Sequence, residues 1–133
     1  MTHNRAGTCN PRKARIQVRS EPRDGRDTPV VCCQCAAPAC IDACPVGALS
    51  TDDSTGAMRV DQEQCTGCFA CVEACMFGAI VPDADAQVVA ICDLCGGDPM
   101  CAKFCRALPH IGASALAYMT PAEFGKRPRR QVG

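Results

Sequence analysis

Cysteine spacing constrains this chain more than any other feature. Fourteen of its 133 residues are cysteines, and twelve of these form three blocks of four. Within the blocks, the gaps between cysteines are two, four and three residues, then two, two and three, then two, five and three. Cysteine at this density indicates either a disulfide scaffold or metal sites. The blocks are Cys32, Cys35, Cys40 and Cys44; Cys65, Cys68, Cys71 and Cys75; and Cys92, Cys95, Cys101 and Cys105.

The start of the chain favours metal ligands over disulfides. The opening, MTHNRAGTCNPRKARIQVRS, is polar and basic and carries no readable secretory signal, so we expect a cytoplasmic protein. In a reducing compartment, regularly spaced cysteines are metal ligands more often than disulfide partners. No apolar run approaches the roughly 18 residues of a transmembrane helix, so we expect no membrane span.

Length and aromatic content bear on the stability of the fold. With 133 residues, the chain is long enough for one compact domain. Aromatic residues make up only 4% of it, which leaves little material for a large hydrophobic core. We therefore expect metal coordination to help hold the fold together.

Charge is segregated along the chain although its formal net value is zero. From Cys32 to Cys105, ten acidic and two basic residues give −8, and the flanks, with twelve basic and four acidic residues, give +8. In a nucleic-acid-binding domain, by contrast, the basic surface belongs to the folded domain itself. We expect no nucleic-acid partner.

Residues 32–105 contain three consecutive units of similar design. In the first two, the cysteine block leads into a Gly-Ala pair, a short apolar strand, a polar turn and a second strand. The pattern predicts hairpins that pair 48–50 with 57–60 and 80–81 with 88–91. About one helical turn is expected between the third and fourth cysteines of each block, in CIDAC, CVEAC and CAKFC. Upstream, ARIQVR at 14–19 predicts one strand.

The spacing within the blocks suits cubane iron–sulfur clusters. Short gaps between the first three thiolates let one loop wrap a single cluster, with backbone N–H groups pointing at the sulfides. The fourth cysteine lies across one helical turn, faces away from that cluster and can reach a neighbouring one. Structural zinc is the alternative, because paired CxxC motifs also bind it. Zinc sites usually take two thiolates from each of two separated hairpins, so the quadruplets favour clusters.

The first two blocks resemble the bacterial-type ferredoxin fold, which binds two [4Fe–4S] clusters. The resemblance implies crossed ligation, in which each block supplies one cysteine to the cluster of the other. Cluster A then takes Cys32, Cys35, Cys40 and Cys75, and cluster B takes Cys65, Cys68, Cys71 and Cys44. One departure from the family is that Pro follows the fourth cysteine only at Pro45, whereas Met76 and Arg106 replace it in the other blocks.

The third block, which opens CDLCGGDPMC, is similar to the final cysteine motif of the iron–sulfur subunits of molybdenum and tungsten oxidoreductases and some hydrogenases. That family usually has four motifs that pair crosswise. Here the first is missing, and NPRKARIQV at 10–18 looks like the stretch that follows it. The resemblance therefore implies that a third cluster, cluster C, is held by the third block alone, through Cys92, Cys95, Cys101 and Cys105.

The expected fold is α+β, with a two-cluster ferredoxin-like core of short hairpins and short helices extended by a third cluster-binding segment. Two cysteines lie outside the three ligand sets. Cys33 is expected to be a buried free thiol and Cys9 an apolar contact. The expected segments are a basic N-terminal arm (1–31), the two-cluster core (32–91), the third cluster-binding segment (92–118) and a basic C-terminal tail (119–133).

The motifs present predict electron transfer without catalysis. The chain has no GxGxxG, no phosphate-binding GxxxxGK and no evident nucleophile with a base. Three [4Fe–4S] clusters would form a relay for single electrons in a subunit of a larger oxidoreductase. The family resemblance implies a catalytic partner with a tungsten or molybdenum pterin, of the aldehyde-oxidoreductase or benzoyl-CoA reductase type, with a ferredoxin or flavin subunit at the other end. Alternatives are a hydrogenase, formate dehydrogenase or carbon monoxide dehydrogenase subunit, or a zinc-stabilised interaction module.

Overall fold

A computed structural model describes residues 10–106, 116, 118 and 119 of the chain. The chain divides into two compact units, Met1–Gly97 and Asp98–Gly133. Cys9 lies outside the described residues, and so does the predicted C-terminal tail apart from Met119. The elements of the first unit are η1 (Pro11–Lys13), β1 (Gln17–Glu21), β2 (Arg26–Val30), α1 (Ala39–Asp42), β3 (Leu49–Thr51), β4 (Met58–Val60), α2 (Ala70–Ala74), β5 (Val81–Asp83), β6 (Val88–Ala90) and α3 (Leu94–Gly97).

Two short antiparallel hairpins follow the first two cysteine blocks, as predicted. β3 pairs with β4, Leu49 opposite Val60, and β5 pairs with β6, Val81 opposite Ala90. In the first of them, Asp52 organises the turn, because its Oδ1 accepts hydrogen bonds from the backbone N–H groups of Ser54 and Thr55. The strand bounds lie within two residues of the predicted ones.

The predicted short helices are also present. α1 and α2 contain the third cysteine of the first and second blocks and end before the fourth, and they pack against each other. α2 begins after Phe69, whose φ of 59° lies in the left-handed region. Because each helix is about one turn long, it holds its shape through packing and not through intrinsic helix stability.

One small core joins the two repeats. It consists of buried side chains from both hairpins and from α2. Five cysteines of the first two blocks pack around it: Cys32, Cys40, Cys44, Cys65 and Cys75. Val89 on β6 and Met58 on β4, each 2% exposed, are among its most deeply buried side chains. Each repeat therefore contributes side chains that complete the core of the other. The buried members of this core are Leu49, Met58, Cys71, Ile80, Val89 and Ile91.

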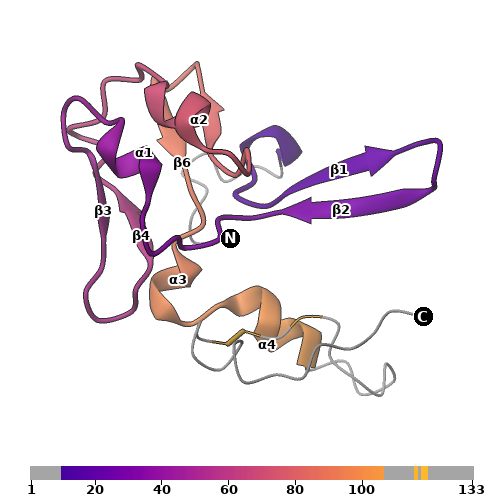
Figure 1. Cartoon of the computed structure of the whole chain (residues 1–133). Helices are drawn as coiled ribbons and strands as arrows, with labels where there is room; N and C mark the ends of the chain where they lie inside the picture. Colours follow the sequence, from indigo (N-terminus) through magenta and orange to yellow (C-terminus); the bar gives the residue numbers. More distant parts are fainter. Residues whose placement is uncertain (1–9, 107–115, 117, 120–133) are drawn as a thin grey trace. The chain divides into compact units, whose positions relative to one another are not determined.

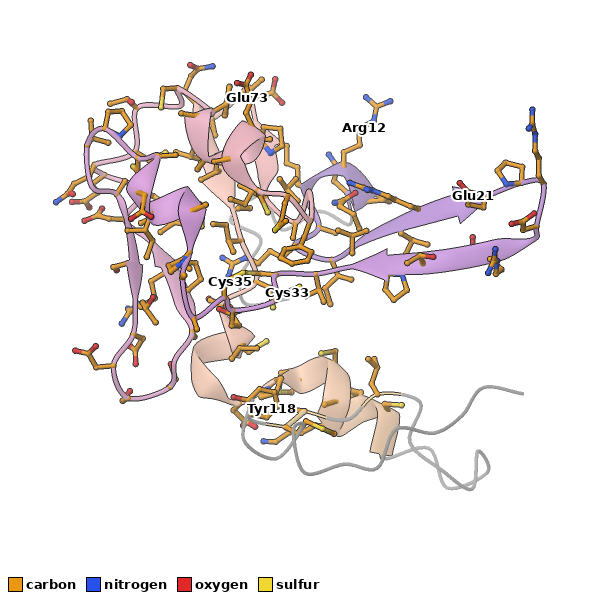
Figure 2. All side chains as sticks on the ribbon, viewed as in Figure 1. Arg12, Glu21, Cys33, Cys35, Glu73 and Tyr118 are labelled. Carbon is orange, nitrogen blue, oxygen red and sulfur yellow. The ribbon has the colours of Figure 1, made fainter. Side chains whose placement is uncertain are left out.

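The region before the first block contains a hairpin, where the sequence predicted a single strand. β1 and β2 pair antiparallel over five positions and extend from the rest of the first unit (Figure 1). Figure 2 shows Arg12 and Glu21 directed into solvent, and most side chains of the hairpin are exposed. β2 was not predicted because this segment contains Pro29 and charged residues, which are uncommon in strands. Pro29 is tolerated here because a two-stranded ribbon leaves the outer edge of each strand free.

Ion pairs connect this N-terminal region to acidic residues of the second repeat and of the segment that follows it. Lys13 Nζ lies 2.9 Å from a carboxylate oxygen of Asp83 and 3.4 Å from one of Asp85. Arg15 Nη1 lies 2.7 Å from Asp93 Oδ2. The charge segregation in the sequence thus corresponds to contacts within the first unit.

The second unit contains α4 (Met100–Arg106), which confirms the helix expected around CAKFC. Lys103 forms an ion pair with Asp98 at the start of this unit. No helix in the described part of the chain has the length and apolar character that crossing a bilayer requires.

Candidate metal centre

Four cysteines line one pocket in the first unit. The open space of the pocket, including the part that faces solvent, is about 310 Å³. Three of its cysteines come from the second block and one, Cys44, comes from the first. Apolar side chains from both hairpins, including Leu49 and Val89, form the remaining wall. The four cysteines are Cys44, Cys65, Cys68 and Cys71.

The thiols of this pocket are close enough for their charges to interact. Burial raises the pKa of the Cys71 thiol to about 11, and the negative charges of Cys44, Cys65 and Cys68 add to the increase. Without a counter-charge, the Cys71 thiol therefore favours its neutral form. A bound cationic metal centre reverses that preference, because it stabilises the thiolates that coordinate it.

Backbone N–H groups converge on the sulfur of Cys44. The Ala48 N–H donates a hydrogen bond of 3.3 Å to Cys44 Sγ. Burial raises the pKa of the Cys44 thiol, but the amides of Ala48, Val46, Leu49 and Gly47 together lower it below its ordinary value. Amides directed at a thiolate stabilise its negative charge.

The second block repeats this arrangement. The Ala79 N–H donates a hydrogen bond of 3.5 Å to Cys75 Sγ. In both repeats a left-handed glycine precedes the donor, with φ of 65° at Gly47 and 61° at Gly78. The Gly-Ala pair visible in the sequence therefore forms a turn that brings an N–H group back to the fourth cysteine.

A second group of thiols lies around α1 and the end of α2. Burial raises the pKa of the Cys40 thiol. The backbone amide of Cys40 lowers this pKa, whereas the negative charge of Cys75 raises it further. Burial also raises the pKa of Cys32 to about 11, with smaller increases from the charges of Cys40, Cys92 and Cys35. Cys75, from the second block, therefore lies near thiols of the first.

Cys33 is exposed, contrary to the expectation of a buried thiol. Its sulfur donates a long hydrogen bond of 3.8 Å to the Val31 carbonyl. Figure 2 shows Cys33 near Cys35, where β2 leads into the first block. The reason is that successive side chains alternate here between the interior and the solvent. Cys32 and Gln34 are half-buried, and Cys33 between them is turned outward.

The third block is divided between the two units. Cys92 and Cys95 belong to the first, where the Cys95 N–H donates to Asp93 Oδ1 at 3.0 Å. Cys101 and Cys105 belong to the second, where the Leu116 N–H donates to Cys105 Sγ at 3.3 Å. Each fourth cysteine in the described blocks thus accepts a backbone hydrogen bond.

Gln34 is a residue near the site that the sequence analysis did not identify. It lies between Cys32 and Cys35, and both ends of its side-chain amide form hydrogen bonds to backbone groups of distant segments. Its only sequence signal is a polar residue inside a CxxC loop, which does not reveal the partners.

The donor chemistry around the pocket fits an iron–sulfur cluster. [4Fe–4S] clusters are held by four cysteine thiolates, and hydrogen bonds to sulfur tune their potential. The pocket supplies four thiols, an apolar wall and amides directed at one of the sulfurs. Among the described side chains, no three His, Cys, Asp or Glu residues form a site for a single metal ion.

Relatives with known names resemble this chain over most of its length. The polyferredoxin-like subunit of an aliphatic sulfonate oxidoreductase from Pyrococcus furiosus is 43% identical over 78% of this chain and 60% of its own. The beta subunit of the NADH-dependent phenylglyoxylate dehydrogenase of Aromatoleum evansii is 36% identical over 80% of this chain and 25% of its own. The hydrogenase-2 operon protein HybA of Escherichia coli O157:H7 is 35% identical over 57% of this chain and 27% of its own.

The chain thus spans between a quarter and three fifths of the length of these relatives. A model of the 4Fe-4S dicluster domain matches residues 25–110, which include all three cysteine blocks. The match extends over more than half of the chain and agrees with the resemblance to two-cluster ferredoxins and to the iron–sulfur subunits of oxidoreductases that the sequence shows. The protein belongs to the 4Fe-4S dicluster domain family.

Proposed function

We propose that this protein is an electron-transfer subunit that relays single electrons through three [4Fe–4S] clusters to or from the catalytic subunit of a larger oxidoreductase. A bound [4Fe–4S] cluster supplies one-electron oxidation and reduction. The chain contributes the thiolates that hold each cluster, the amides that stabilise their charge and the apolar side chains that limit water access.

The observation that carries this proposal is the pocket that Cys44 shares with Cys65, Cys68 and Cys71. These are the four ligands that crossed ligation assigns to cluster B. The interaction of Cys75 with Cys40 supports the reciprocal assignment, in which cluster A takes Cys32, Cys35, Cys40 and Cys75. For cluster C, with Cys92, Cys95, Cys101 and Cys105, the support is the family match, which extends over the whole third block.

For the catalytic partner, we propose an enzyme with a tungsten or molybdenum pterin, of the aldehyde-oxidoreductase or benzoyl-CoA reductase type. The polyferredoxin-like relative belongs to an aliphatic sulfonate oxidoreductase, and another relative belongs to a phenylglyoxylate dehydrogenase. Both names describe subunits of oxidoreductases and so support the assembly with a catalytic subunit. A ferredoxin or flavin subunit would serve the other end of the relay.

A hydrogenase is the second candidate partner. It is favoured by the similarity to the hydrogenase-2 operon protein, which covers 57% of this chain. The same three clusters would serve either complex, so the two candidates differ in the metal of the partner and not in the sites of this chain.

Iron and sulfide content tests the proposed function. Protein purified without oxygen should be brown and contain about twelve iron atoms and as many sulfide ions per chain if three cubanes are present. About eight would leave the third block without a cluster. Zinc without visible absorption would instead establish the zinc-stabilised module.

The partner is tested by purifying the complex from the native organism through a tag on this chain. Tungsten or molybdenum in stoichiometric amount with a co-purifying large subunit supports the pterin enzyme. Nickel and iron in that subunit, with no tungsten or molybdenum, would instead identify a hydrogenase.

A further inference from the structure

A side chain of the β1–β2 hairpin contacts the second repeat at the turn that follows Cys75. The guanidinium of Arg19, on β1, fills the space beside Gly78 in which a Cβ would lie, with Nη2 nearest to that position and Cζ 3.5 Å from it. Arg19, Cys75 and Gly78 all belong to the first unit, Met1–Gly97. The N-terminal hairpin therefore brings a charged group to the turn of a proposed cluster ligand.

The contacted turn is the one that directs an amide at Cys75. Gly78 immediately precedes Ala79, whose N–H donates a hydrogen bond of 3.5 Å to Cys75 Sγ. A side chain at position 78 would take the place of the guanidinium, so the lack of one at Gly78 is what admits Arg19. A positive charge at this position is close to the sulfur that the amide contacts.

The equivalent turn of the first repeat has no such neighbour. Gly47 precedes Ala48, whose N–H donates to Cys44 Sγ at 3.3 Å, and its φ of 65° is close to the 61° of Gly78. Among the described residues, no atom lies within 4 Å of the position that a Cβ on Gly47 would take. The two turns are therefore alike in their amide contacts and differ in the charge placed beside them.

The charge of Arg19 is not neutralised by a carboxylate in the described part of the chain. No ion pair of Arg19 is found there, whereas Arg26 on β2 pairs with Asp24 at 2.7 Å. A guanidinium is not deprotonated in proteins, so this charge is constant across the pH range of the folded state. The N-terminal region has a second contact with the same repeat, because Lys13 Nζ lies 2.9 Å from Asp83.

Reduction of a [4Fe–4S] cluster adds one negative charge, and charges around a cluster shift its reduction potential. A nearby positive charge stabilises the reduced form more than the oxidised form. We propose that Arg19 raises the reduction potential of the cluster that Cys75 ligates, cluster A, relative to that of the cluster that Cys44 ligates, cluster B. This inference rests on the proposed function and deepens it, because it states which residue makes the two clusters of the core inequivalent.

The test compares the full-length wild type with Arg19→Met, Arg19→Lys and the matched control Arg26→Met. Methionine removes the charge, whereas lysine keeps it. Arg26 is suited as a control because it lies on the same hairpin, opposite Glu21 at the end of the ribbon, and its replacement removes the same charge. All four proteins are reconstituted anaerobically with iron and sulfide, and their iron content is measured first.

The readout is the distribution of electrons in the partly reduced protein. The β-proton resonances of Cys44 and Cys75 are shifted by the cluster that each cysteine ligates, so they report the reduced fraction of each cluster. In Arg19→Met, the equilibrium constant for reducing the Cys75 cluster relative to the Cys44 cluster should fall about three-fold or more, which is about 28 mV at about 59 mV per ten-fold change. Arg19→Lys should restore most of the wild-type value, and Arg26→Met should keep it.

Salt separates an effect of charge from an effect of packing. Arg19 is exposed, so dissolved ions screen its charge. At about 1 M salt, where the Debye length is about 3 Å, most of the difference between the wild type and Arg19→Met should disappear. A potential altered through the packing of the hairpin would keep this difference at high salt.

Gly78→Ala displaces the guanidinium without removing it, because the added Cβ takes its place. Gly47→Ala is the matched control, since it places alanine in the same left-handed conformation with no atom within 4 Å. The potential of the Cys75 cluster should therefore fall more in Gly78→Ala than the potential of the Cys44 cluster falls in Gly47→Ala. Adding Arg19→Met to Gly78→Ala should have less effect than Arg19→Met has alone, because the two changes remove the same contact.

Two results would overturn the proposal. One is a wild-type distribution of electrons in an Arg19→Met protein with its full iron content. The other is a shift in Arg19→Met that is the same at low and high salt and that Arg19→Lys does not reverse. If Arg19→Met loses a cluster, salt titration of the wild type still decides, since an unchanged distribution there excludes an effect of charge. Failure of the proposed function is distinguishable, because iron and sulfide would then be missing from the wild type itself.

Discussion

Cys44 and Cys71 belong to different cysteine blocks but line the same pocket, and their charges interact. They are separated by a hairpin and by the whole loop of the second block in sequence. Crossed ligation requires this type of proximity, because a cluster held by the second block must take its fourth thiolate from the first.

Replacing Cys44, a cysteine of the first block, should therefore affect cluster B, which takes its other three ligands from the second block. Cys44→Ser should remove or destabilise cluster B, with a loss of about four of about twelve iron atoms per chain. Cluster A should keep its spectrum, since Cys44 lies outside its assigned ligands. Iron analysis and paramagnetic resonance check both parts.

Cys33→Ser is the control, because this exposed cysteine lies outside all three assigned sets. This variant should retain the full iron content. Loss of cluster A alone in Cys44→Ser would contradict crossed ligation.

The hairpins and helices were accessible from the sequence because they depend on local signals. Apolar runs around polar turns predicted β3–β4 and β5–β6, and the gap between the third and fourth cysteines predicted α1 and α2. β2 was not predicted, because Arg26, Asp27 and Pro29 are uncommon in strands.

The contacts that position the site are not local and left no pattern in the sequence. Gln34 binds Met58 and Cys92, which are 24 and 58 residues away. Lys13 contacts Asp83, which is 70 residues away, and only the segregation of charge that underlies this pair is visible in the sequence. The pairing of blocks was implied by the family resemblance, because spacing alone does not say which loops face each other.

The ion pairs of Lys13 should hold the N-terminal hairpin to the core. Lys13→Met removes the contacts with Asp83 and Asp85, so amides of residues 14–21 should exchange several-fold faster. Raising the salt concentration should produce part of the same effect in the wild type, because the pair is partly exposed. Arg12→Met is the control, since Arg12 is exposed and has no carboxylate partner among the described residues. Equal exchange in the two variants would show that the Lys13 ion pairs do not anchor this region.

The turn between β3 and β4 should be resistant to acid. The Ser54 hydroxyl, the Thr55 N–H and hydroxyl, and Arg59 hold the pKa of Asp52 well below the ordinary value of 3.8. Because the pKa of Asp52 is lowered in the folded state, its ionised carboxylate stabilises the turn at all pH values above 3.8. This contribution is lost as the pH falls toward the folded pKa. The carboxyl resonance of Asp52 should therefore not titrate between pH 7 and about 4.

Asp52→Asn should remove this pH-dependent contribution. Because the amide cannot carry the charge that these donors stabilise, exchange in residues 52–57 should already be faster at neutral pH. Asp53→Asn changes the charge of the neighbouring exposed residue and should leave the turn protected. Titration of the Asp52 resonance near its ordinary pKa would show that the donors do not hold the carboxylate.

Gly67 is the position in the second block where a side chain is least tolerated. A Cβ there would lie 2.6 Å from the carbonyl oxygen of Gln87, and its φ of +66° is left-handed. Gly56→Ala is a matched control, since Gly56 has the same φ of +66° but no atom within 4 Å of its added Cβ. The left-handed conformation alone costs about 1–3 kcal/mol for a non-glycine residue and applies to both variants. Gly67→Ala must in addition move the backbone of the β5–β6 turn. Its denaturation midpoint should therefore be lower than that of Gly56→Ala. Cluster B should be the first cluster lost, because Cys65 and Cys68 flank the displaced residue. Thermal denaturation followed by visible absorption measures both effects, and equal midpoints would show that the turn yields without cost.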